Sequence, residues 1–101
     1  MVDPELDALK REFLHEAQDK VREIEAALGD SNGSAELDRV AYIAHQLKGS
    51  GGSYGYQRIS AEAAEIEKVV ESMNGDGAEQ IRRHVRLLTE EIDQRSRELS
   101  A

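Results

Sequence analysis

Apolar side chains recur every three or four residues along the first part of this chain, which is the spacing that places them on one face of an α-helix. We predict a helix from about residue 4 to 28. Asp3 can cap its start, and Pro4 fits the first helical position, where a backbone N–H is not needed. Gly29 can end the helix. The apolar face contains Leu6, Leu9, Phe13, Ala17, Val21, Ile24 and Leu28.

A second helix is predicted from about residue 35 to 52, with Ser34 as its cap. Two endings fit its sequence, since each glycine inside a helix costs about 1 kcal/mol relative to alanine. The helix either ends near Lys48, with Gly49 as its C-terminal cap, or continues through a glycine-rich stretch. Its apolar face contains Leu37, Val40, Ala44 and Leu47, with Ala41 at the edge.

Two further segments repeat the helical pattern, from about residue 56 to 73 and from about 77 to 99. Asn74-Gly75 separates them, and Asp76 with Glu79 can form a capping box at the start of the last helix. Four amphipathic helices joined by short turns predict an all-α fold, an antiparallel up-down-up-down four-helix bundle. The apolar faces of these two helices contain Ile59, Ala63, Ile66, Val70 and Met73, and Ala78, Ile81, Val85, Leu88, Ile92 and Leu99.

The length and charge of the chain narrow its function. A chain of 101 residues suits a single domain, here residues 1–101, and is too small for a kinase. The net charge of -8 argues against nucleic acid as a partner and gives no basic patch for a membrane. Without cysteine there are no disulfides and no thiol catalysis. No signal peptide or membrane-spanning run is visible, so we expect a cytoplasmic monomer.

His45 stands out because three of its five neighbours on the same side of the helix are Ala or Gly. Val40, Ala44 and Leu47 face the core, which places His45 off that face and towards solvent. A neutral imidazole has one ring nitrogen with a free lone pair, and such a nitrogen is a nucleophile towards phosphorus. An ammonium group one helical turn away could neutralise the phosphoryl group. The neighbours one turn from His45 are Ala41, Tyr42, Lys48 and Gly49, and Gly52 lies two turns after it.

The run His-Gln-Leu-Lys-Gly-Ser-Gly-Gly-Ser-Tyr-Gly-Tyr, which begins at His45, resembles the signature of histidine-containing phosphotransfer (HPt) domains, including the related phosphoacceptor domain of chemotaxis kinases. The family pattern is a His followed by an apolar residue, a Lys and two glycines, and these are Leu47, Lys48, Gly49 and Gly55 here. The resemblance favours a helix that continues past Gly49, with glycines that let a partner come close. One departure is that residues 51 and 52 are both Gly, where many members carry Ser or Ala at one of the two positions.

The resemblance implies a phosphocarrier without kinase activity or a cofactor of its own. His45 would accept a phosphoryl group from a receiver-domain aspartyl-phosphate, or from a sensor or hybrid histidine kinase, and pass it to a response regulator. Lys48 would stabilise charge, and Mg²⁺ would be held by the receiver domain. The family places a Glu or Gln twenty-two residues after the His, here Glu67, which would accept a hydrogen bond from Nδ1–H and leave Nε2 free. The partner-binding ridge would contain Ala41, Tyr42, His45, Gly49 and Gly52.

Other functions fit the sequence less well. A di-metal carboxylate bundle uses Glu-x-x-His motifs, but only one, Glu12 to His15, occurs. A phosphate-binding loop is disfavoured because Lys48 precedes the glycines and no strand leads in. The serious alternative is a non-phosphorylated helical scaffold that binds a partner through the same face. Met1 favours a free-standing protein over a fragment of a larger kinase.

The remaining histidines and aromatic residues have ordinary interpretations. His15 lies opposite Phe13 and should face solvent, whereas His84 borders an apolar face and suits a half-buried structural role. Tyr54 and Tyr56 are expected to pack the turn between the second and third helices.

Overall fold

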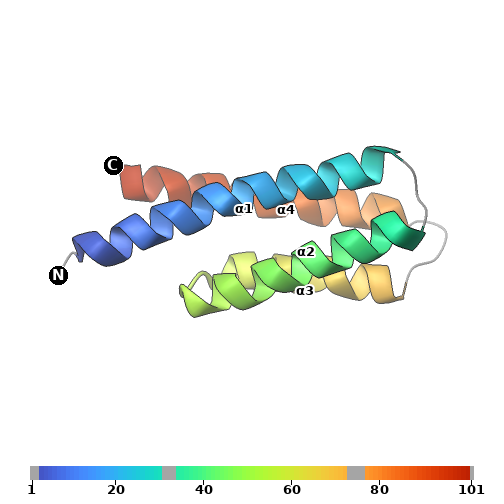
Figure 1. Cartoon of the computed structure of the whole chain (residues 1–101), viewed down its shortest axis with the longest axis horizontal. Coiled ribbons are helices and arrows are strands. Elements are labelled where there is room, and N and C mark those ends of the chain that lie inside the picture. Colours follow the sequence, from blue (N-terminus) through green and yellow to red (C-terminus); the bar gives the residue numbers. More distant parts are fainter. Residues whose placement is uncertain (1–2, 31–33, 73–76, 101) are drawn as a thin grey trace.

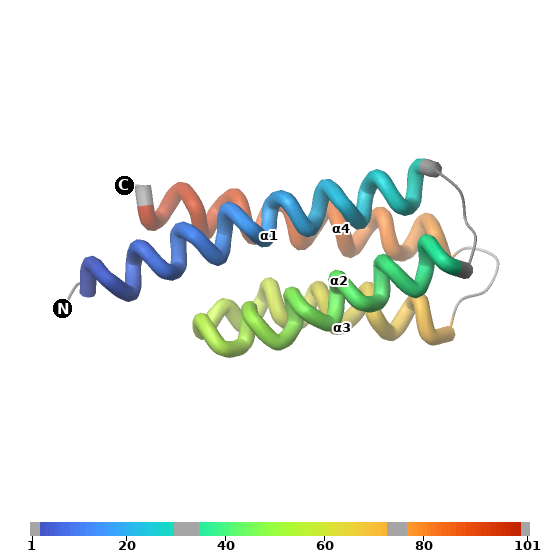
Figure 2. Tube along the Cα trace, in the orientation of Figure 1, coloured from blue at the N-terminus to red at the C-terminus, as the bar shows by residue number. Residues whose placement is uncertain are grey.

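The chain folds as four α-helices, described by a computed structural model over residues 3–30, 34–72 and 77–100. The helices are α1 (Pro4–Asp30), α2 (Ser34–Ser53), α3 (Gln57–Glu71) and α4 (Gly77–Ser100). Successive helices run in opposite directions (Figure 1), and the Cα trace shows the same course (Figure 2). Contacts join α1 to α2, α2 to α3, α3 to α4 and α4 to α1, so the helices form a closed ring. The fold is the antiparallel bundle that the helical pattern predicts.

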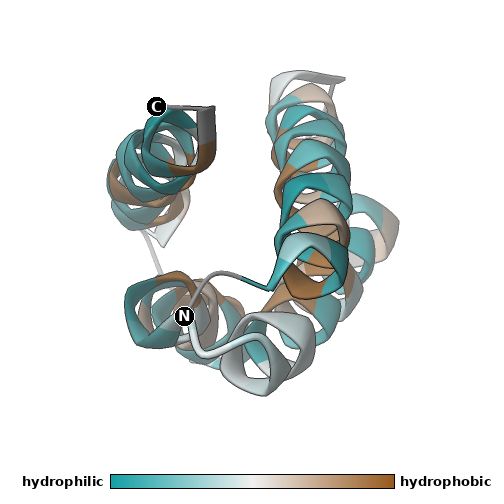
Figure 3. Cartoon of the chain, turned by 90° about the vertical axis from the view of Figure 1, so that its left-hand side faces the viewer, coloured by the Kyte–Doolittle hydropathy of each residue, from teal (hydrophilic) through white to brown (hydrophobic). Residues whose placement is uncertain are grey.

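The core is formed by the apolar faces of all four helices. Hydrophobic and hydrophilic residues occupy different sides of each helix when the bundle is viewed from the end at which α1 begins and α4 finishes (Figure 3). Leu14 and Ile43, absent from the predicted faces, are also buried. Among the described residues no polar or charged residue is buried. The largest fully buried side chains are Leu14, Ile24, Val40, Leu47, Ile59, Ile66, Ile81, Leu88 and Ile92.

Leu6 and Leu9, which begin the predicted apolar face of the first helix, are not part of the core. These side chains are 41% and 49% exposed. The reason is helix length: α1 has 27 residues, whereas α2 and α3 have 20 and 15, so the first turns of α1 project past the ends of their neighbours (Figure 1). A regular apolar pattern continues there without a helix to cover it.

The helix ends differ from the prediction in detail. The Oδ1 atom of Asp3 accepts hydrogen bonds from the backbone N–H groups of Glu5 and Leu6 at 3.1 and 3.2 Å, which confirms the predicted cap. Gly29 does not end α1, which runs on to Asp30. Gly29 is not in the left-handed conformation that a glycine cap uses, since only Gly55 has a positive φ among the described residues.

The predicted end of the third helix and start of the fourth lie partly outside the described residues. The third helix ends at Glu71, two residues earlier than predicted. Met73, the Asn74-Gly75 break and the Asp76 half of the capping box lie outside the described residues, as does the side chain of Ser34.

The glycine-rich stretch is helical, because α2 continues to Ser53. This confirms the continuous helix. Gly51 is buried, and a Cβ there would lie 3.2 Å from both Ile59 Cγ2 and Ser60 N, so this glycine allows α2 and α3 to approach closely. Gly55, with φ of 82°, makes the turn into α3.

The tyrosines of this turn pack on α1, in agreement with their predicted structural role. The ring of Phe13 lies 4.9 Å from that of Tyr54 and 6.0 Å from that of Tyr56, both nearly parallel. Burial is the main cause that raises the pKa of Tyr56 above its usual value. The turn is therefore fixed to the bundle, and the end of α2 is held from two sides.

Candidate functional site

His45 lies on the outer side of α2, in its second half. Its side chain is 65% exposed, whereas the flanking core residues Val40, Ala44 and Leu47 are fully buried. The helical advance of about 100° per residue turns His45 away from them. Because the buried residues fix the rotation of α2, they also fix the direction in which the imidazole leaves the bundle.

Glu67 reaches His45 from the neighbouring helix α3. Its Oε2 atom lies 2.9 Å from Nδ1 of His45. The Glu67 side chain is only 18% exposed, and the preceding Ile66 is buried in the core. A carboxylate can only accept a hydrogen bond, so in the neutral imidazole the proton is on Nδ1 and the lone pair is on Nε2.

Lys48 shares the same carboxylate. Its Nζ atom donates to Oε1 of Glu67 at 3.5 Å, and its side chain remains 46% exposed. The backbone oxygen of Lys48 accepts a hydrogen bond of 2.8 Å from the Ser60 hydroxyl on α3. The imidazole and the ammonium are thus brought together by one acid, and the helix that carries them is tied to α3.

The surface beside His45 has little side chain on it. Both Gly49 and Gly52 are exposed. A Cβ at Gly49 would meet nothing within 4 Å, and one at Gly52 would meet only the Ser60 hydroxyl, at 3.7 Å. These two glycines therefore face open space, unlike Gly51, which faces α3.

Tyr42 and Ala41 continue this surface towards the start of α2. Tyr42 is exposed and Ala41 is half-buried. The hydroxyl of Tyr42 accepts a hydrogen bond of 3.1 Å from Gln46, whose amide oxygen accepts one of 3.5 Å from Lys20 on α1. These hydrogen bonds between α2 and α1 were not predicted. The four-residue spacing of Tyr42 and Gln46 is a readable signal, but nothing in the sequence aligns Lys20 with them.

The described residues were also compared with the requirements of a metal site. Within residues 3–30, 34–72 and 77–100, no group of three or more His, Cys, Asp or Glu residues is placed to hold a metal ion. Glu12 and His15 are both exposed on α1, whereas a di-metal bundle requires ligands that point inwards. No described helix is apolar over a stretch long enough to cross a membrane.

A comparison with protein families gives one match that covers most of the chain. A family model described as Hpt domain matches residues 8–98, which include His45, Lys48, the glycines and Glu67. The chain belongs to the Hpt domain family. Hpt domains transfer phosphoryl groups on histidine in two-component phosphorelays and are phosphocarriers, not kinases. Comparisons with curated proteins and with solved structures give no match.

This Hpt domain contains a second His–Glu pair. Nδ1 of His84 on α4 lies 2.8 Å from Oε2 of Glu62 on α3, and the two residues are separated by 22 positions, as are His45 and Glu67. The side chain of His84 is only 19% exposed. The predicted half-buried position of His84 is confirmed, and its partner was not foreseen. The two pairs have similar hydrogen bonds and differ in access.

Proposed function

We propose that this Hpt domain carries a phosphoryl group on Nε2 of His45. It would accept the group from an aspartyl-phosphate of a receiver domain, or from a sensor or hybrid histidine kinase, and pass it to a response regulator. The observation that carries the proposal is an imidazole that is 65% exposed and that, among the residues the structure describes, is hydrogen-bonded only through Nδ1. Such a ring presents its other nitrogen to a macromolecular partner.

The reaction follows from this geometry. The lone pair of Nε2 attacks phosphorus, and the bond between phosphorus and the aspartyl oxygen breaks, so that the carboxylate leaves with the electron pair. The ring gains positive charge, while its Nδ1 proton stays in the hydrogen bond to Glu67. The Glu67 carboxylate stabilises this charge, and the exposed Lys48 ammonium can turn towards the phosphoryl oxygens. The reverse reaction donates the group onward.

The partner would dock on the ridge that contains the imidazole and its small neighbours. Glycines at 49 and 52 let a folded surface approach Nε2 without obstruction by side chains. Tyr42 offers an exposed ring at one end of the ridge, a residue type favoured at interfaces. Mg²⁺ would be bound by the receiver domain. The ridge residues are Ala41, Tyr42, His45, Gly49 and Gly52.

We further propose that residues 1–101 act as one monomeric module of the cytoplasm, without a cofactor of its own. Phosphorylation should then need only this chain, Mg²⁺ and a phosphorylated receiver domain.

The test is transfer of radiolabelled phosphate from a phosphorylated receiver domain to the Hpt domain. The wild-type chain should acquire a label that is stable in base and labile in acid, as expected for phosphohistidine. His45→Gln should acquire none, whereas His15→Gln should be labelled like the wild type, because His15 is exposed on α1 away from Glu67. A chain that binds the receiver but takes up no label would instead be a scaffold. Label retained in His45→Gln would contradict the assignment of the acceptor.

A further inference from the structure

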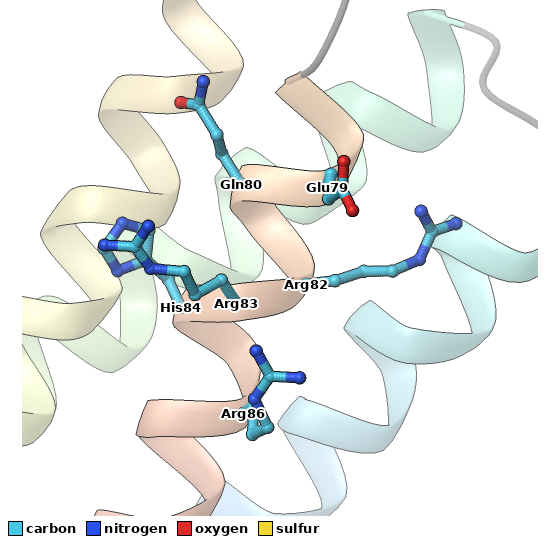
Figure 4. A pocket seen from close by; sticks show the side chains of 6 residues that line it. All are labelled: Glu79, Gln80, Arg82, Arg83, His84 and Arg86. Atoms are coloured by element: carbon cyan, nitrogen blue, oxygen red, sulfur yellow. The ribbon is translucent and has the colours of Figure 1, made fainter.

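Three arginines form an exposed cluster on α4, away from the proposed phosphotransfer site. Arg82, Arg83 and Arg86 lie around an open hollow of about 640 Å³, together with Glu79, Gln80 and His84 (Figure 4). Arg82 extends towards α1, Arg83 extends towards α3 beside the His84 ring, and Arg86 lies between them (Figure 4). We call these three arginines the α4 arginine cluster. The net charge of -8 does not reveal this cluster, because the acidic residues of the chain outnumber the basic ones.

The α4 arginine cluster is not neutralised within the described part of the chain. None of its members has an acidic oxygen within 4.0 Å among the described residues. Some arginines elsewhere do form ion pairs: Arg39 pairs with Glu23, and Arg95 pairs with acids on its own helix. Three guanidinium groups on adjacent turns, without an acidic partner in residues 3–30, 34–72 and 77–100 as far as the structure describes them, favour an anionic ligand, since each has a planar fork that fits a carboxylate.

Acidic residues limit the length of that ligand. Glu79 lies one turn before the cluster, Glu90 one turn after it, and Glu25 faces it from α1 across a groove. A long chain of phosphates, as in nucleic acid, would run past the arginines and meet these carboxylates. A short acidic segment would not. The charge pattern therefore favours a protein ligand with a few clustered carboxylates.

Apolar surface adjoins the arginines. Arg82 and Arg86 also line a groove of about 470 Å³ between α1 and α4, where Leu28 and Val85 are among the lining residues. Leu87, next in sequence to Arg86, is 39% exposed. Leu28 and Val85 are buried at the bottom of the groove, so Leu87 is the accessible apolar side chain beside the arginines, and arginine next to such a side chain is a combination enriched at protein interfaces.

The cluster is remote from His45. Helices α2 and α4 occupy opposite corners of the bundle, and in their described residues no Cα of one lies within 8 Å of a Cα of the other. A partner on α4 would leave the ridge on α2 accessible.

We propose that the α4 arginine cluster, with Leu87 and the α1–α4 groove, is a second docking surface, for an acidic segment of a partner protein. Aspartate or glutamate side chains of the segment pair with the arginines, and an apolar side chain enters the groove. The surface works independently of phosphate on His45, so it goes beyond the proposed phosphotransfer. It could hold the carrier beside a kinase or scaffold while a receiver domain binds at α2.

The test uses the full chain labelled with ¹⁵N and a capped helical peptide of about 15 residues, in which glutamates and leucines share one face at the three- and four-residue spacing of a helix. The titration is carried out at about 0.15 M salt, where exposed charges more than about 8 Å apart are largely screened. Amide shifts should concentrate on α4 around residues 79–90 and on the last turns of α1, and should saturate. The variant H45Q should bind the peptide as well as the wild type does. The test of this surface is therefore independent of whether His45 accepts a phosphoryl group.

Two triple variants with the same change in net charge test whether the α4 arginine cluster binds the peptide. The triple variant R82E/R83E/R86E should weaken binding at least about tenfold. The variant R22E/R39E/R97E makes the same change in net charge at exposed positions elsewhere, and should change binding less than about twofold. Equal weakening by both triple variants, or shifts spread over the whole bundle, would overturn the proposal. Tighter binding of a short DNA duplex or of anionic phosphatidylglycerol vesicles through the same arginines would also overturn it. The single variant R83E, expected to weaken binding about threefold, provides a check that does not depend on three simultaneous changes.

Discussion

Replacement of Glu67 tests the link between the hydrogen bond at Nδ1 and the chemistry at Nε2. A hydrogen bond to a charged group contributes about 1.5–3 kcal/mol. The 2.9 Å contact here belongs to that class, but the 65% exposed ring is partly screened by solvent, so the lower end of the range applies. A loss of about 1.4 kcal/mol in the transition state slows the reaction about tenfold. Glu67→Ala should therefore reduce phosphotransfer about tenfold, and Glu67→Gln, which keeps an acceptor oxygen, about threefold.

The assay should separate chemistry from docking. Single-turnover transfer from a phosphorylated receiver domain, measured over a range of Hpt domain concentrations, gives the rate at saturation and the concentration for half-maximal rate. Glu67→Ala should lower the first and leave the second nearly unchanged, because the carboxylate is largely covered and adds little to the docking ridge. Glu62→Ala is the matched control. Glu62 lies on α3, as Glu67 does, and its replacement removes the carboxylate that is hydrogen-bonded to His84 on α4. A saturated rate unchanged by Glu67→Ala, or lowered equally by Glu62→Ala, would refute the positioning role.

Three further predictions concern charge, packing and pH. Lys48→Ala should slow phosphotransfer about threefold to tenfold while His45 is still labelled, and a complete loss of labelling would mean that Lys48 does more than screen charge. Gly49→Ala should raise Tm by roughly 2–6 °C in calorimetry, since a helical alanine replaces a glycine in open space. Gly51→Ala should lower Tm, because its Cβ would press on α3. Equal shifts of Tm in the two variants would contradict this difference. The raised pKa of Tyr56 means that the folded state holds the phenol proton more tightly, so its stabilising contribution is complete below the ordinary pKa of 10.0 and is lost as the pH rises through the folded pKa. Tyr56→Phe should flatten this alkaline loss in urea unfolding measured at several pH values, and an unchanged slope would count against the burial argument.

The sequence was sufficient for the fold because burial in a helical bundle follows the helical repeat. Ile24, Leu47 and Leu88 lie where their spacing predicts. Leu14 was missed because the interior face of a helix is wider than a single line of residues. Leu6 and Leu9 lie on the predicted apolar face and are nevertheless exposed, because a repeat describes a face but not whether a neighbouring helix is long enough to cover it.

The site was only partly accessible to sequence reasoning. The exposure of His45 follows from the burial of its neighbours on α2, a local property. Its contact with Glu67 depends on the register between α2 and α3, which the helical repeat does not determine, and the expectation came from resemblance to the HPt family. The partnership of His84 with Glu62 has the same sequence separation and was not foreseen. The α4 arginine cluster was overlooked because net charge averages over the chain.

The glycines at 49, 51 and 52 have a consequence for how the activity could be lost. A segment so poor in helix-forming side chains stays helical mainly because it packs against α3 and against the turn that contains Tyr54 and Tyr56. Damage to that support, for instance at Ile59, should let the last turns of α2 unwind long before the whole bundle melts. His45 would then lose its alignment with Glu67 although every residue around it remained chemically intact. A variant that no longer transfers phosphate therefore need not carry its substitution at the histidine.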